Sequence, residues 1–99
     1  MSFEMTVGLF VVDGEKYASY RAAIAPLLEA AEGRFRYDFE VARTLKTENR
    51  HDINRLFVLR FPDRTSKNHF FSDPQYLGIR ARFFEKAVDG TTIIAEYST

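Results

Sequence analysis

The sequence contains neither cysteine nor tryptophan, and only five glycines, three prolines and two histidines among its 99 residues. Without cysteine the chain can form no disulfide, no thiolate metal site and no cysteine nucleophile. Its longest apolar runs, such as residues 7–12, fall far short of the roughly 20 residues that a membrane-spanning helix needs. The 14 basic and 14 acidic side chains cancel, so neither nucleic acid nor an anionic membrane is expected as a partner.

The residues that are present indicate one small domain over residues 1–99. The apolar share is 45%, near the norm of folded proteins, and chains of about 100 residues usually hold a single core. A glutamate near the N-terminus stands where a signal peptide would be basic, so a cytoplasmic location is expected. No pair of residues has metal-ligand spacing and there is no glycine-rich phosphate loop, so neither a metal nor a cofactor is expected.

Four segments are predicted to be strands. Residues 5–12 are almost wholly apolar, and residues 53–61 are apolar on both faces apart from three polar positions. Residues 34–46 alternate between apolar and charged side chains, and residues 91–97 are rich in β-branched side chains. The polar stretch before the third strand is predicted to be a hairpin turn that leaves His51 exposed.

The alternating segment is predicted to place two carboxylates, Asp38 and Glu40, on one face with Arg36 beside them. It assigns the apolar side chains Phe35, Tyr37, Phe39 and Val41 to the other face. Two carboxylates on one face could act as an acid and a base if their surroundings separated their pKa values. A solvated face of an edge strand explains the same pattern without any chemistry.

A helix is predicted between the first and second strands. Asp13 can cap its start, apolar residues recur at helical spacing, and Gly33 is a natural stop. Pro26 interrupts this pattern because it lacks an N–H and its ring crowds the preceding turn. We therefore expect either a kink at Pro26 or two abutting helical pieces.

Two helices are predicted between the third and fourth strands. Asp63 can cap a short helix that reaches about Phe71. Asp73 followed by Pro74 is typical of an N-cap and first helical position, and it opens a second helix that reaches about Val88.

The resulting order β-α-β-β-α-β predicts an α+β, ferredoxin-like fold with an antiparallel four-stranded sheet. In this fold the first and third strands are central, in agreement with their apolar character. Helices on one side leave the other face of the central strands uncovered, and an apolar patch of several hundred Å² is more than a monomer normally exposes. We therefore predict a homodimer that closes sheet against sheet.

Several segments occur in the order and spacing of a known family. They are residues 25–28 (Ala-Pro-Leu-Leu), 33–35 (Gly-Arg-Phe), 54–62 (Asn-Arg-Leu-Phe-Val-Leu-Arg-Phe-Pro) and 71–76 (Phe-Ser-Asp-Pro-Gln-Tyr). Over residues 11–97 the chain resembles a family of small uncharacterised bacterial proteins, known chiefly as a domain of unknown function, in the dimeric α/β-barrel superfamily. The resemblance implies a ferredoxin-like fold and a face-to-face dimer, but no reaction.

The chain also departs from the commoner pattern of that family. Many relatives carry Arg-Gly-Gly early in the second strand, where this sequence has Asp38-Phe39-Glu40. If that element shapes a ligand site in the relatives, the site is altered or absent here.

Arg80 is the most informative single position. On a helix from Pro74 to Val88 it is the one charge within an arc of apolar side chains. An unpaired guanidinium facing a core costs several kcal/mol, so Arg80 needs a partner. It either holds an anionic ligand in a cleft between helix and sheet, or it pairs with a carboxylate of the protein or extends to the rim of the cleft.

The leading hypothesis is a homodimer whose subunits each bind a small, largely apolar molecule with an acidic or carbonyl group. Arg80 would orient this ligand, with Tyr76, Phe83 and His69 nearby and Tyr37 as a polar contact. Superfamily analogy suggests an enzyme instead, such as a cofactor-free oxygenase, a haem-degrading enzyme or a small isomerase. The absence of tryptophan and the scarcity of histidine weaken the haem version.

A third interpretation is an assembly module whose essential surface is the dimer face. Under that interpretation the cleft between helix and sheet should be filled, and an internal carboxylate should neutralise Arg80.

Overall fold

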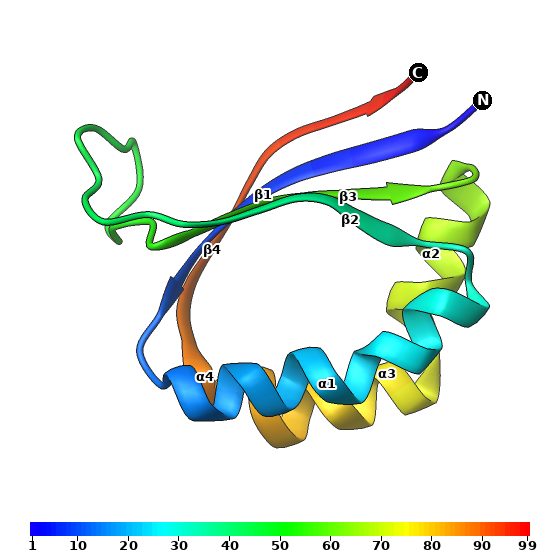
Figure 1. Cartoon of the computed structure of the whole chain (residues 1–99), viewed down its shortest axis with the longest axis horizontal. Helices are drawn as coiled ribbons and strands as arrows, with labels where there is room; N and C mark the ends of the chain where they lie inside the picture. Colours follow the sequence, from blue (N-terminus) through cyan, green and yellow to red (C-terminus); the bar gives the residue numbers. More distant parts are fainter.

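Helices cover only one face of a four-stranded sheet (Figure 1). The computed structural model describes all of residues 1–99. In chain order the elements are β1 (Phe3–Val11), α1 (Gly14–Ala30), β2 (Arg34–Glu40), β3 (Arg55–Phe61), α2 (Arg64–Ser72), α3 (Pro74–Ile79), the π-helical turn η1 (Arg80–Phe84), α4 (Glu85–Ala87) and β4 (Val88–Ser98). None of the helices combines the length and the apolar composition that crossing a membrane requires.

The strands lie in the order β2-β3-β1-β4, and every neighbouring pair is antiparallel. This arrangement confirms the ferredoxin-like prediction, including the central positions of β1 and β3. The predicted helix caps are also present: Asp13, Asp63 and Asp73 each accept a hydrogen bond from a backbone N–H two or three residues later. The strands differ in length from the prediction, because β2 ends at Glu40 and β4 already begins at Val88.

The first helix is continuous through Pro26, so of the two alternatives expected there, two abutting pieces is wrong. Its end also differs from the expectation that Gly33 supplies the stop. Glu32, with φ of 58°, is the residue in the left-handed conformation, and no glycine in the chain has a positive φ. A non-glycine residue rarely adopts this conformation, so Glu32 holds a position that usually favours glycine or asparagine.

The long helix predicted from Pro74 to Val88 contains a π-helical turn. Within η1 the N–H of Glu85 donates to the carbonyl of Arg80, five residues earlier, where an α-helix would use the residue four earlier. The extra residue rotates the following side chains around the helix axis. Tyr76, Phe84 and Ala87 therefore share the buried face, whereas Phe83 is only partly buried.

The strand β1 separates the two faces of the sheet by strict alternation. Its odd-numbered residues are buried against the helices: Phe3, Met5, Val7, Leu9 and Val11. In β2 a bulge at Arg36 breaks the alternation, because Phe35 lies opposite Leu59 and Tyr37 lies opposite Val58. Phe35 consequently faces the helices while Tyr37 and Phe39 face away, so the prediction of one shared face for these aromatic residues is wrong at Phe35.

The loop of residues 41–54 folds back over one end of the helix-free face, which we call the open face (Figure 1). The ring of His51 stacks on Phe10 with ring centroids 6.0 Å apart, and a side chain at Gly90 would collide with that ring. Asn49 hydrogen-bonds Thr92 on β4. The expectation that His51 is simply exposed is therefore wrong, since the imidazole closes the loop onto the sheet.

Candidate functional site

A cavity of about 300 Å³ lies between the helices and the sheet. Its wall is mainly apolar and aromatic, and it includes core residues of the two central strands and of α1. The polar or charged groups on the wall are Tyr17, Tyr20, Lys67, Tyr76, Arg80 and Thr91. The volume lies at the lower end of the range typical of small-molecule sites, and an apolar wall with a few polar groups is their usual composition.

The cavity opens between α3 and the edge strand β4. Four of its wall residues are exposed, Leu77 and Arg80 on the helical side and Thr91 and Ile93 on β4. Leu77 and Ile93 are respectively 47% and 53% exposed, so the entrance itself carries apolar side chains. The opening is therefore suited to an amphipathic molecule.

Arg80 lies at this entrance and has no close carboxylate. Its side chain is 45% exposed, and the nearest carboxylate oxygen, Glu85 Oε1, is 4.0 Å from Nη1. The guanidinium also lies 5.3 Å from the ring centre of Phe84. A surface pair of this length contributes little energy, so Arg80 is available to an incoming anion.

Tyr20 and Tyr76 form a hydroxyl pair in the cavity wall. Their hydroxyl oxygens are 2.9 Å apart, and the two residues are only 6% and 4% exposed. Tyr76 is fixed in turn by the rings of Phe70 and Phe71, whose centres lie 4.9 and 5.2 Å away. Burial raises the pKa of both phenols, so both hydroxyls stay protonated at neutral pH.

The structure brings together two of the five residues predicted to bind a ligand, Arg80 and Tyr76. The other three do not line the cavity. Phe83 is half-buried against the core within the π-turn. His69 is exposed on α2, and Tyr37 is 52% exposed on the open face, where it stacks on Phe39.

Lys67 and Tyr20 line the cavity but were not identified as site residues from the sequence. Lys67 precedes Phe70 and Phe71 by three and four residues, which places it on their face of α2. Its ammonium is already 3.2 Å from a carboxylate oxygen of Glu96 on β4. Lys67 therefore joins α2 to the edge of the sheet. Of the two cations, Arg80 is the one without a close carboxylate partner.

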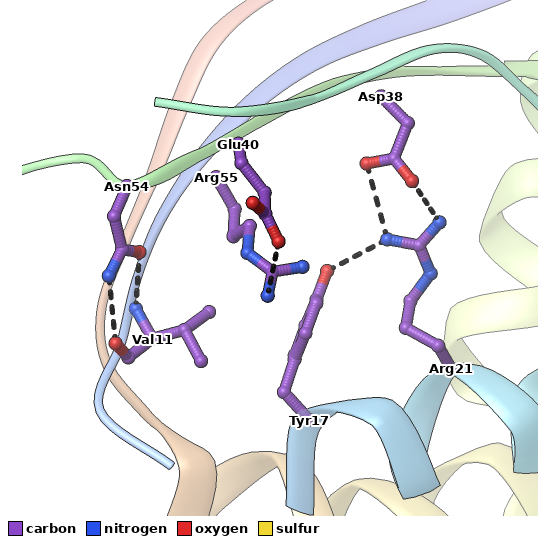
Figure 2. A network of polar contacts seen from close by, with 7 residues as sticks. All are labelled: Val11, Tyr17, Arg21, Asp38, Glu40, Asn54 and Arg55. Carbon is purple, nitrogen blue, oxygen red and sulfur yellow. Dashed lines mark hydrogen bonds and ion pairs between the residues drawn. The ribbon is translucent and has the colours of Figure 1, made fainter. Parts of the chain in front are cut away.

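The carboxylates of Asp38 and Glu40 face the helices, each beside an arginine (Figure 2). Arg21 on α1 points toward Asp38 and donates to both of its oxygens, at 2.6 and 3.4 Å. Arg55 lies 3.5 Å from Glu40. This pairing supports a structural role for the two carboxylates. Arg36, predicted to lie beside them, lies on the opposite face.

Tyr17 and Asn54 complete this set of contacts (Figure 2). The Tyr17 hydroxyl accepts from Arg21 at 3.1 Å, and burial raises the pKa of this phenol despite the nearby guanidinium. The Asn54 amide accepts from the N–H of Val11 and donates to its carbonyl, both at 2.8 Å. The Arg21–Asp38 pair joins α1 to β2, and the Asn54 bonds join the end of β1 to the residue that precedes β3.

The open face carries a buried carboxylate on the central strand β1. Glu4 is 2% exposed, and it accepts hydrogen bonds from Arg36 at 2.8 Å and from the Tyr97 hydroxyl at 2.9 Å, with Arg60 at 4.0 Å. Burial acts to raise the pKa of Glu4, but the bonds from Tyr97 and Arg36 outweigh it and hold the pKa below the usual value. The hydrophobic pattern of the sequence does not predict this cluster, although the alternation of β1 places Glu4 on the open face.

No group of three or more His, Asp or Glu side chains converges in an arrangement that could hold a metal ion. The chain also matches no curated protein. The family described as a domain of unknown function (DUF1330) matches residues 6–97.

Solved structures show the same fold at low sequence identity. A protein of unknown function from Rhodopseudomonas palustris superposes with a TM-score of 0.83 at 16% identity, over 99% of this chain and 82% of that one. A dimeric protein of unknown function with a ferredoxin-like fold from Bacteroides fragilis gives 0.60 at 13% identity, over 99% and 96%. A dimeric ferredoxin-like protein of unknown function from Thermobifida fusca gives 0.65 at 10% identity, over 100% and 92%. These identities establish a shared fold alone.

Proposed function

This chain belongs to the DUF1330 family, a domain of unknown function, and we propose that it is a homodimeric small-molecule-binding protein. Each subunit binds a small, largely apolar molecule that carries an acidic or carbonyl group. The ligand occupies the cavity between the helices and the sheet, and Arg80 orients its polar end at the entrance.

The observation that supports this proposal is an apolar cavity of about 300 Å³ with Arg80 at its opening, where this arginine has no close carboxylate partner. A pure assembly module would be expected to fill this space and to neutralise Arg80 internally. Protein interiors normally leave few voids larger than a water molecule, so a cavity of this size favours a binding role. Turnover is not part of the proposal, because Asp38 and Glu40, the two carboxylates considered as acid and base, are each paired with an arginine.

Replacing Arg80 by glutamine is expected to weaken the binding of octanoate about 10- to 100-fold. A charge-assisted hydrogen bond contributes about 1.5–3 kcal/mol, and about 1.4 kcal/mol corresponds to a factor of ten in affinity. Isothermal titration calorimetry on the purified protein measures the change.

Arg82→Gln is the matched control, because Arg82 is exposed on the same helical segment and does not line the cavity. Octanoate should bind this variant as tightly as the wild type. Thr91→Trp, at the entrance, should block octanoate and so locate the site. Equal affinity of the Arg80→Gln variant and the wild type would contradict the assigned role of Arg80.

The open face supports the dimer. Four apolar or aromatic side chains on β2 and β4 are 42–52% exposed there or at the adjoining strand edge: Tyr37, Phe39, Ile94 and Tyr97. Exposed aromatic side chains grouped on one face are typical of protein–protein contacts. Two of the solved structures with this fold are described as dimeric, which agrees with the proposal.

Phe39→Arg is expected to weaken the dimer at least tenfold, since a buried aromatic anchor commonly contributes 2 kcal/mol or more. Sedimentation velocity over a concentration series measures the dissociation constant. Val12→Arg is the control, because Val12 is 56% exposed and lies beyond the end of β1. A monomeric wild type, or equal effects of the two substitutions, would refute the assigned interface.

A further inference from the structure

The hydroxyl pair of Tyr20 and Tyr76 has one O–H donor more than its shared hydrogen bond requires. Two phenols carry two O–H protons, and the bond between their oxygens, 2.9 Å apart, consumes one of them. Neither hydroxyl makes another hydrogen bond within the protein. Whichever tyrosine donates to the other, the pair keeps one proton without an acceptor.

This spare donor is available to the cavity. Both tyrosines line the cavity and are at most 6% exposed, so bulk water has little access to their hydroxyls. A buried donor without an acceptor costs about 1–3 kcal/mol, and a ligand oxygen at this point would remove that cost. The pair therefore marks the place where the cavity wall can recognise an acceptor atom.

Arg80 supplies a second donor close to the pair. Arg80 follows Tyr76 by four residues, which makes the two side chains neighbours on the helix surface. Its guanidinium lies 5.3 Å from the ring centre of Phe84, and that ring centre lies 4.9 Å from the ring centre of Tyr20. The other cation of the cavity wall, Lys67, is already paired with Glu96. A hydroxyl donor and a guanidinium side by side match the two acceptor oxygens of a carboxylate.

The cavity volume limits the size of the ligand. About 300 Å³ corresponds to roughly ten times the volume that a water molecule occupies in the liquid, and so to about ten non-hydrogen atoms. The wall beyond the tyrosine pair is formed by aliphatic and aromatic side chains, among them Ile24, Leu28 and Phe57. Such a wall accepts a hydrocarbon chain or a single aromatic ring.

From this geometry we infer that the ligand is a monocarboxylate of about ten non-hydrogen atoms. One carboxylate oxygen accepts the spare proton of the Tyr20–Tyr76 pair, the other accepts from Arg80, and the apolar tail fills the cavity. This inference rests on the proposed function, which allows an acidic or a carbonyl group, and it selects the acid.

The first test compares three probes of equal length, octanoate, octanamide and 1-octanol, by calorimetry at pH 7. Octanoate should bind at least tenfold more tightly than either neutral probe. If all three bind equally well, the inferred carboxylate fails while the proposed binding cavity stands. If none of them binds, the proposed function and the inference both fail.

The second test removes the two tyrosine hydroxyls, first one at a time and then together. Tyr20→Phe and Tyr76→Phe each leave one hydroxyl with its proton free, so each should weaken octanoate binding less than about threefold. The double variant leaves no hydroxyl and should weaken it at least tenfold. In each single variant the affinity for 1-octanol is expected to change little, because its hydroxyl can donate to or accept from the remaining tyrosine hydroxyl.

Circular dichroism melts confirm that these variants fold, since Tyr→Phe keeps the buried rings. A loss in each single variant as large as that in the double variant would overturn the shared-proton arrangement. An unchanged octanoate affinity in the double variant would overturn the role of the tyrosine pair altogether.

Discussion

Phe61→Ala is expected to lower the free energy of unfolding by about 3–5 kcal/mol, a large part of the 5–15 kcal/mol typical of a small domain. Phe61 is completely buried at the end of β3. Its ring lies 5.6 Å from that of Phe70 and 6.1 Å from that of Phe71. These two rings hold Tyr76, so the substitution removes the support that joins α2 and α3 to the sheet. Urea unfolding followed by circular dichroism measures the loss.

Leu45→Ala is the control, because a large apolar side chain is removed from a loop position that is 83% exposed. Measured at one fixed protein concentration, this variant should lose less than about 1 kcal/mol of folding free energy, since little buried area disappears. A loss below about 1 kcal/mol for Phe61→Ala would contradict the central position assigned to its ring.

Glu4→Gln is expected to lower the free energy of unfolding by about 1.5–3 kcal/mol at pH 7. Its carboxylate accepts charge-assisted hydrogen bonds from Arg36 and Tyr97, and the neutral amide replaces one acceptor oxygen with a donor. The loss stays below that of a deeply buried ion pair, because the Arg36 and Arg60 side chains are 36% and 34% exposed and can turn toward water.

The same substitution predicts a change in acid sensitivity. The pKa of Glu4 lies below its usual value of 4.5 in the folded protein, so the unfolded chain binds the proton more readily. The stabilising effect of the carboxylate is complete above pH 4.5 and is lost as the pH falls through the lower folded value. The difference in the free energy of unfolding between the wild type and Glu4→Gln should therefore become smaller as the pH falls below 4.5.

Urea unfolding between pH 7 and pH 3 tests both statements. Glu40→Gln is the control, because the Glu40 side chain is 83% exposed beside Arg55 and should contribute less than about 0.5 kcal/mol. A Glu4→Gln variant as stable as the wild type at pH 7, or a difference that does not change with pH, would rule out the role assigned to the carboxylate.

The sheet could be predicted from sequence because the hydrophobic pattern of each strand reflects its place. The two central strands are apolar on both faces or nearly so, and Asp13, Asp63 and Asp73 mark the helix starts by their capping chemistry. The bulge at Arg36 and the π-turn at Arg80–Phe84 could not be predicted in the same way. Each inserts one residue into a regular period, and no local propensity marks the position.

These two irregularities also explain why the site was predicted only in part. Tyr76 precedes the π-turn and Arg80 begins it, so regular helical spacing still places both residues on the cavity side. Phe83 follows the inserted residue, and Tyr37 follows the bulge, so a regular period assigns both to the wrong environment. Glu4 was missed for another reason: its partners Arg36 and Tyr97 are far along the chain and meet it only in the folded sheet.

The pairing of β1 with β4 joins residues from opposite ends of the sequence, since Phe3 lies opposite Ser98. At a translation rate of about 5–20 residues per second, β4 is completed roughly 5–20 seconds after β1. Throughout that interval one edge of β1 stays unpaired and the cavity lacks its β4 wall. The growing chain therefore keeps an unpaired strand edge, which is a site of aggregation, until its last strand is made.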